Sequence, residues 1–155
     1  MPQTDEVAQI KEEFIEKIGM IAQSEGLPRI AGRVLATLVY DGRRISFGEL
    51  AETLGVSRGS ISSSVRLLED RQIIKRVAKA GDRQDYFEVA EDAFINLIET
   101  SAVRARRAYK EIASTLAKLP LSEAGPHARL KAYGDFYDVI DIALTEAAMQ
   151  MKKRQ

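Results

Sequence analysis

The junction between two short helical segments, at residues 55–57, constrains the fold of this 155-residue chain more than any other feature of its sequence. Ser46 and Glu49 have the spacing of a capping box, which predicts a short helix over residues 47–53. The glycine of the junction suits the left-handed backbone that ends a helix, and its serine is a favourable N-cap for the next one. Two helices joined by so short a turn form a helix-turn-helix.

The pattern after Arg71 changes to a period of two. Residues 73–77 and 85–89 alternate like strands, and Gly81-Asp82 between them is a turn signal, so we expect a β-hairpin. A helix-turn-helix followed at once by a hairpin predicts a mainly α, winged helix-turn-helix fold with a two-stranded β-wing.

Helical periodicity continues on both sides of this segment. Residues 5–25 predict one helix, residues 91–119 a second of about 28 residues, and residues 127–152 a third. In the first, the apolar stripe consists of Val7, Ile10, Phe14, Ile18 and Ile21.

The long apolar seam after residue 91 is more than a small winged helix can cover, so a twin chain is expected to bury it. An intrachain bundle with the last helix is the alternative, and the two are compatible. The expected organisation is an N-terminal dimerisation helix (1–26), a winged helix-turn-helix (27–90) and a C-terminal helical dimerisation region (91–155).

The composition is that of an ordinary water-soluble chain, with 45% apolar and 30% charged residues and no cysteine. No apolar run approaches the roughly 20 residues that cross a bilayer, and no secretory leader is evident, so we expect a cytoplasmic protein without membrane association. The net charge is zero, yet residues 27–84 carry eleven Lys/Arg against six Asp/Glu, whereas residues 1–26 carry two against six. The central segment is therefore basic.

The helix expected over residues 57–71 has one unusual face. Ile61, Val65 and Leu68 share the side that faces the core, while the opposite side is small, hydroxylated and free of carboxylates until Glu69. Such a surface can enter the major groove of DNA, where an acidic side chain would meet phosphate repulsion. Ordinary helix capping explains part of the serine content but not the absence of acid. The candidate DNA-binding residues of this helix are Ser57, Arg58, Gly59, Ser60, Ser62, Ser63 and Arg66.

The hairpin adds further cations. Lys75, Lys79 and Arg83 are the candidates for contacts with the DNA backbone or the minor groove, where arginine is attracted by the negative potential. For Lys75, as for Arg76, a merely solvated hairpin is an equal alternative.

Three stretches of the chain, GLPRIAGRVLATLVYD (26–41), ELAETLGVSRGSISSSVRLLEDRQIIKRV (49–77) and GDRQDYFEV (81–89), resemble the GbsR-like branch of the MarR regulators, which includes repressors of glycine-betaine synthesis genes. The resemblance implies a dimeric winged-helix transcriptional regulator whose terminal helices form the dimer interface. MarR proteins often carry an Asp-x-Arg at the wing, whereas here Asp82 and Arg83 are adjacent.

We therefore expect a homodimeric transcriptional regulator that binds a pseudo-palindromic DNA operator in a sequence-specific manner and represses transcription. A winged-helix module for protein–protein interaction without DNA binding is the alternative. No P-loop, Rossmann fingerprint, HExxH or GxSxG motif is present, so we expect no enzyme, no cofactor and no metal.

A small-molecule effector is also considered. Tyr109, Tyr133 and Tyr137, with Asp135 and Asp138 close in sequence, are candidates for gripping a quaternary ammonium ligand. The alternative, which we favour, is that these aromatics are core residues at helical spacing.

Overall fold

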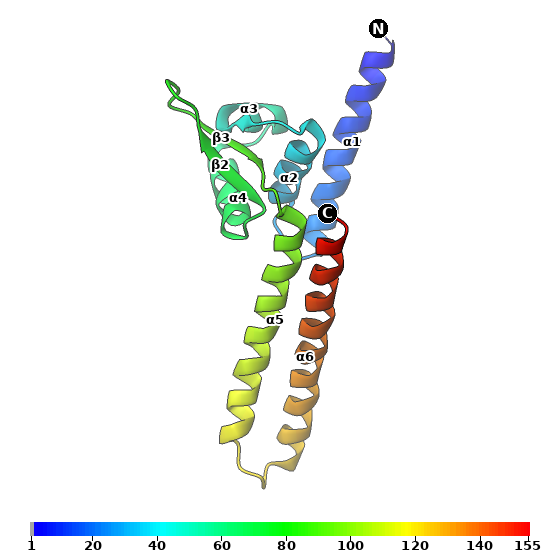
Figure 1. Ribbon diagram of the computed structural model, residues 1–155, viewed down its shortest axis with the longest axis vertical. Coiled ribbons are helices and arrows are strands. Elements are labelled where there is room, and N and C mark those ends of the chain that lie inside the picture. Colours follow the sequence, from blue (N-terminus) through cyan, green and yellow to red (C-terminus); the bar gives the residue numbers. More distant parts are fainter. Residues whose placement is uncertain (1) are drawn as a thin grey trace. The chain divides into compact units, whose positions relative to one another are not determined.

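The computed structural model describes residues 2–155, and the chain divides into two compact units at the Ala93–Phe94 boundary. The first unit is a winged helix preceded by a long helix, and the second is a helical hairpin (Figure 1). The elements in chain order are α1 (Pro2–Ser24), α2 (Arg29–Asp41), β1 (Ile45–Ser46), α3 (Phe47–Leu54), α4 (Arg58–Asp70), β2 (Ile74–Ala78), β3 (Asp85–Val89), α5 (Ala93–Lys118) and α6 (Ala124–Lys153).

The core of the first unit lies where α2, α3 and α4 meet the sheet. Leu38, Leu50, Ile61, Leu68 and Phe87 are all buried, so each of these elements contributes an apolar side chain to it. The predicted winged helix-turn-helix is confirmed.

The sheet has one strand more than the predicted hairpin. Its order is β1-β3-β2, all antiparallel, because the two residues of β1 pair with β3 in the register Ile45↔Phe87 and Ser46↔Tyr86. Ile45 is fully buried, which anchors β1 at the edge of the sheet.

The helix ends of the helix-turn-helix follow the sequence signals. Gly55 has φ 62°, in the left-handed region, and Ser57 Oγ accepts a hydrogen bond from Ser60 N at 3.1 Å. Ser46 Oγ likewise accepts from Glu49 N at 3.1 Å. The other half of the predicted capping box is wrong, because the Glu49 carboxylate pairs with Arg43 instead of turning back to Ser46.

Helix α1 buries Ile15 and Ala22, which lie beside the predicted stripe. Of the stripe itself, Phe14 and Ile18 are half-buried, and the Phe14 ring lies 5.9 Å from the ring of Tyr40 on α2. Val7, Ile10 and Ile21 are at least half exposed, whereas Ala22 is buried against α2. A Cβ placed on Gly32 would lie 2.5 Å from the Ala22 Cβ, so the two helices approach closely at this point. Part of the predicted stripe, at Val7, Ile10 and Ile21, therefore stays on the surface of the chain.

Ion pairs flank this close approach. Glu16 Oε2 on α1 accepts a hydrogen bond from Arg29 Nη2 at 2.6 Å, and Glu16 Oε1 lies 2.7 Å from Arg33 Nε. Arg33 Nη2 also donates to the Leu54 carbonyl at 3.2 Å, which links α2 to the end of α3. These contacts give the segment around Arg29, Gly32 and Arg33 a structural role in docking α1.

We expect Glu16→Gln to lower the free energy of unfolding by about 0.5–1 kcal/mol at neutral pH, a modest effect because the ion pair is partly exposed. The hydrogen bond from Arg29, together with the charge of Arg33, holds the pKa of Glu16 below its ordinary 4.5. Its contribution is therefore present above pH 4.5 and is lost as the pH falls through the lower folded value. Thermal unfolding at several pH values measures this difference.

The control for that experiment is Glu12→Gln, an exposed residue on the same helix with no ion pair among residues 2–155. It is expected to leave the stability unchanged at every pH. An offset between wild type and Glu16→Gln that does not shrink as the pH is lowered below 4.5 would contradict the assignment.

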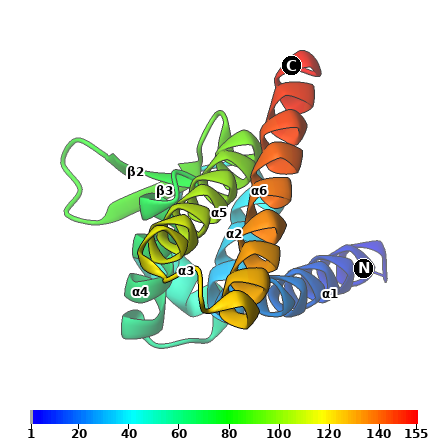
Figure 2. The same ribbon diagram turned by 90° about the horizontal axis from the view of Figure 1, so that it is seen from below.

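The second unit consists of α5 and α6 running antiparallel and side by side (Figures 1 and 2). Arg106 on α5 binds Asp141 on α6 at 2.8 and 3.0 Å, and a Cβ on Gly134 would lie 3.4 Å from Ile112 Cγ2. Helix α6 begins at Ala124, earlier than predicted. Its Pro126 is tolerated because the first turn of a helix needs no N–H there.

Across residues 2–155, no helix has the length and apolarity required to span a bilayer.

Candidate nucleic-acid interface

Helix α4 separates into a buried and an exposed side. Ile61, Ser64, Val65 and Leu68 are buried, as the helical spacing predicts. The candidate DNA-binding residues lie on the other side: Ser57, Arg58, Gly59, Ser63 and Arg66 are exposed, and Ser60 and Ser62 are half-exposed.

The serine hydroxyls of this face differ in their partners. Ser57 Oγ caps the helix and lies 3.0 Å from Ser60 Oγ, so capping does account for two of the serines. Ser63 Oγ donates to the Gly59 carbonyl at 2.8 Å. Ser62 has no hydrogen-bond partner within the described part of the chain, which leaves its hydroxyl available for a base edge or a phosphate.

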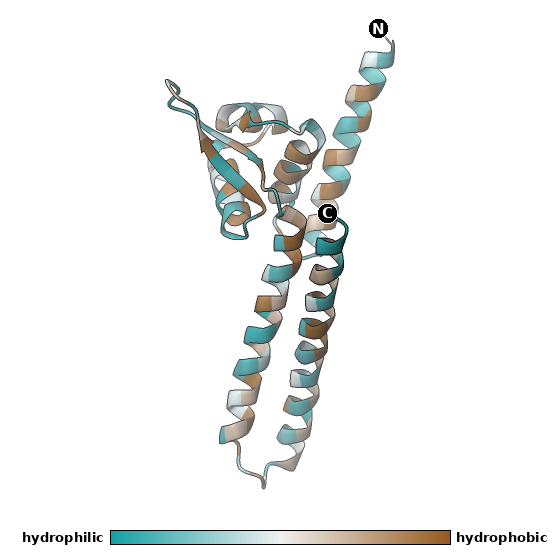
Figure 3. Ribbon diagram, viewed as in Figure 1, coloured by the Kyte–Doolittle hydropathy of each residue, from teal (hydrophilic) through white to brown (hydrophobic). Residues whose placement is uncertain are grey.

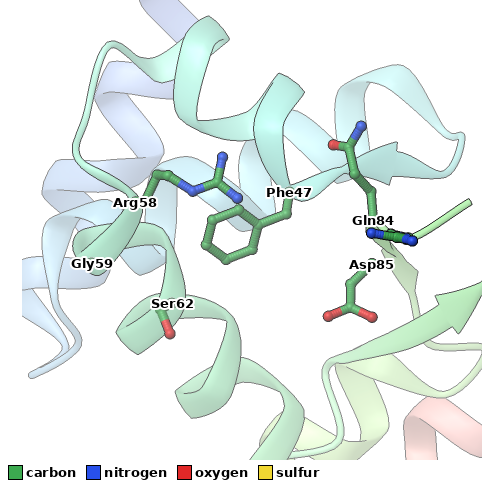
Figure 4. A pocket seen from close by; sticks show the side chains of 7 residues that line it. Phe47, Arg58, Gly59, Ser62, Gln84 and Asp85 are labelled. Carbon is green, nitrogen blue, oxygen red and sulfur yellow. The ribbon is translucent and has the colours of Figure 1, made fainter.

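A groove of about 430 Å³ lies between α4 and the hairpin, lined by Phe47, Arg58, Gly59, Ser62, Arg83, Gln84 and Asp85. Figure 4 shows Arg58 beside the Phe47 ring, with Asp85 reaching in from the strand side. The Arg58 guanidinium carbon is 4.8 Å from the centre of that ring, an arrangement that holds the cation at the rim of the groove.

Sequence reasoning missed two residues of this groove. Phe47 is half-buried at the start of α3, and its ring forms a wall of the groove. Gln84 was not singled out, and its Oε1 would lie 3.1 Å from a Cβ on Gly48, at the start of α3. Neither residue carries a sequence signal of its own, since each depends on how α3 approaches the hairpin.

Asp82 organises the turn of the hairpin. It accepts hydrogen bonds from Tyr86 Oη at 2.6 Å and from Gln84 N at 2.9 Å. The hydrogen bond from Tyr86 lowers the pKa of Asp82, and the same bond raises the pKa of Tyr86. Lys79 Nζ lies 5.7 Å above the Tyr86 ring. Asp82 is thus committed to the turn that presents the exposed Arg83.

The cations of the basic central segment fall into two groups. Lys75 lies 3.3 Å from Glu88, which also holds Arg44 at 3.0 Å, and Arg76 lies 2.8 Å from both Glu69 and Asp85. By contrast, Arg58, Arg66 and Arg83 form no ion pair with any residue in the range 2–155. These three arginines therefore place unpaired positive charge on the exposed side of α4 and in the groove beside it.

The three candidate effector tyrosines lie near one another in the second unit. The hydroxyls of Tyr133 and Tyr137 are 3.1 Å apart, and Tyr109 on α5 lies against Gly134. Tyr133 and Tyr109 are 52% and 38% exposed, so they are not core residues of the single chain. Asp135 pairs with Lys131 at 2.7 Å, which neutralises one carboxylate predicted to hold a cation.

Among residues 2–155, no cluster of three or more His, Asp or Glu side chains could hold a metal ion.

Comparison with known proteins places this geometry in one family. Residues 25–85 match the model of the MarR family. The chain is 34% identical over 145 residues to the HTH-type transcriptional regulator MmpR5 of Mycobacterium tuberculosis, covering 92% of this chain and 87% of that protein. It is 31% identical over 98 residues to the HTH-type transcriptional repressor OpcR of Bacillus subtilis, covering 63% of this chain and 53%, about half, of that protein.

A solved structure supports the same placement. The crystal structure of a transcriptional regulator superposes with a TM-score of 0.71 at 30% identity, covering 92% of this chain and 98% of that one. This chain belongs to the MarR family of winged-helix transcriptional regulators.

Proposed function

We propose that this regulator, which is not an enzyme, represses transcription by binding a pseudo-palindromic operator as a homodimer, with α4 in the major groove and the β2–β3 hairpin as the wing. The observation that carries the proposal is the acid-free, hydroxyl-lined face of α4 together with Arg58, Arg66 and Arg83, which form no ion pair with residues 2–155. A related protein, OpcR, is named a repressor, which supports the sign of regulation.

The groove beside α4 fits the DNA backbone. When a helix enters the major groove and a wing reaches the minor groove, the strand that separates the two grooves passes between helix and wing. Arg58 and Arg83 supply positive charge on this path, and the N-terminus of α4 adds its dipole. Gly59 leaves the backbone room to approach, since nothing lies within 3.4 Å of where its Cβ would be.

The homodimer is supported by apolar surface that the single chain leaves uncovered. Val7, Ile10 and Ile21 of α1 are exposed, as are Phe136 and Ile142 of α6, although α6 already pairs with α5. Figure 3 shows hydrophobic residues recurring along both helices. An intrachain bundle alone therefore does not account for these faces, and a second copy of the chain would bury them. We assign residues 1–26 and 91–155 to the dimer interface because of these apolar faces and the resemblance described above. We assign the chain to the GbsR-like branch because of the three resembling segments.

We expect Arg66→Ala to weaken operator binding by about 10–100-fold and to relax the preference at one base pair of each half-site, because an arginine–base contact contributes about 1–3 kcal/mol. Gel shift over a set of operator variants measures both effects. Arg107→Ala is the matched control, since it removes one exposed positive charge from α5, outside the α4 face. Unchanged binding by Arg66→Ala would show that this face does not touch bases.

Salt dependence separates this function from that of an interaction module. Binding to DNA that neutralises several phosphates weakens steeply as salt is added. The reason is that releasing counterions from the DNA gains less free energy when the surrounding solution already contains much salt. We expect wild type to show this steep loss with DNA from its own promoter region. A protein that binds no DNA at any salt concentration, and instead retains a protein partner, would support the alternative module.

The effector site at Tyr109, Tyr133 and Tyr137 stays a prediction, and we favour the dimer interface as the role of these aromatics. Accordingly, millimolar choline or glycine betaine is expected to leave the melting temperature unchanged. A rise of several degrees that Tyr133→Ala removes would instead support a cation site of the aromatic type.

A further inference from the structure

Arg76 occupies a central place between α4 and the wing. It lies in the middle of β2, where its Nη2 donates to Glu69 Oε1 in the last turn of α4 at 2.8 Å. Its Nη1 donates to Asp85 Oδ2 at the start of β3, also at 2.8 Å. The guanidinium carbon lies 5.3 Å from the centre of the Phe87 ring, the cross-strand neighbour of Arg76. One side chain thus touches two carboxylates on two different elements.

These two carboxylates lie where anions would interfere with DNA. Asp85 lines the groove together with Arg58, Ser62 and Arg83, and its side chain is 45% exposed. Glu69 is the first acidic residue on α4 after the acid-free stretch. Without a cation beside them, Asp85 in the groove and Glu69 in the last turn of α4 would both repel a backbone phosphate that approaches them.

The hydrogen-bonding capacity of Arg76 is largely used inside the protein. Its Nε, Nη1 and Nη2 all donate to Glu69 or Asp85. By contrast, Arg58 and Arg83, which line the same groove, form no ion pair within residues 2–155. Arg58 and Arg83 are therefore available for an external ligand, whereas Arg76 is paired with neighbouring carboxylates.

We propose that Arg76 is a positioning residue that does not contact DNA and instead neutralises Asp85 and Glu69, so that the groove between α4 and the hairpin accepts a backbone phosphate. This inference rests on the proposed DNA-binding function and assigns a specific residue to it. It predicts that losing Arg76 no longer lowers operator affinity once the two carboxylates are removed. Losing an arginine that binds phosphate directly should still lower the affinity in that background.

The test is a charge-rescue experiment on operator affinity in the full chain, measured by fluorescence anisotropy. Arg76→Met keeps an unbranched side chain over Phe87 but removes the charge, and it is expected to weaken binding about tenfold or more. The triple variant Glu69→Gln/Arg76→Met/Asp85→Asn is expected to recover to within about threefold of wild type, because the repulsion is gone. Arg58→Gln serves as the contrast, since the same two carboxylate substitutions should leave most of its loss in place.

The outcomes are distinct. A triple variant as weak as Arg76→Met would overturn the proposal and indicate a direct DNA contact, and so would wild-type affinity of Arg76→Met alone. Melting temperatures report folding separately, and a variant that melts more than about 10 °C below wild type is replaced by Arg76→Gln, for which the same rescue is required. If wild type itself shows no preference for its operator, the proposed function fails, and that result is visible before any variant is compared.

Discussion

Ser63→Glu is expected to reduce operator affinity about 100-fold or more while leaving the protein folded. Ser63 is exposed in the middle of the acid-free face of α4, and its hydroxyl donates to the Gly59 carbonyl of its own helix. A carboxylate at this position would approach phosphates and base acceptors, and like-charge juxtaposition costs several kcal/mol. Each subunit of a dimer would introduce one such charge, so the effect would occur in both half-sites.

The matched control is Ser63→Gln, which has the same length and no charge. We expect it to retain operator affinity to within about tenfold, so that the difference between Glu and Gln isolates the electrostatic effect. Fluorescence anisotropy measures binding, and circular dichroism with thermal melting checks the fold. Equal affinities for the Glu and Gln variants would place Ser63 away from the DNA and remove the main support for the interface.

Gly32→Ala is expected to destabilise the first unit by about 1–3 kcal/mol, even though alanine is the better helix former. The new Cβ would lie 2.5 Å from the Ala22 Cβ, 3.0 Å from the Ile18 carbonyl oxygen and 3.1 Å from the Gly19 Cα. Since two of these atoms belong to the backbone of α1, the helix itself has to move away from α2. Chemical denaturation followed by circular dichroism measures the loss.

The control is Gly59→Ala, the same substitution in the exposed part of α4. The nearest atom to its Cβ would be Ser57 Oγ at 3.9 Å, so the stability is expected to stay the same or to rise by up to about 1 kcal/mol. Combining Gly32→Ala with Ala22→Gly removes the closest contact and should recover part of the loss. If Gly32→Ala is as stable as wild type, α1 and α2 do not approach as closely as described.

The sequence alone was sufficient for the features that depend on neighbouring residues. The left-handed Gly55, the cap at Ser57, the strand over residues 85–89 and the buried side of α4 at Ile61 and Leu68 all match the structure. Each of these follows from backbone conformation or helical geometry within a few residues, so the sequence spacing already contains the information. The small, acid-free face of α4 was visible for the same reason.

Only the tertiary structure decided which face of α1 is buried and which cations remain available. The apolar stripe through Val7 and Ile10 was the obvious core face, yet the close approach of Gly32 selects the side of α1 that carries Ala22. The sequence left the role of Arg76 open, and the structure shows that it binds Glu69 and Asp85 while Arg83 stays exposed. Side-chain size at a helix crossing and the partners of a charge depend on residues brought together by folding, which sequence spacing does not encode.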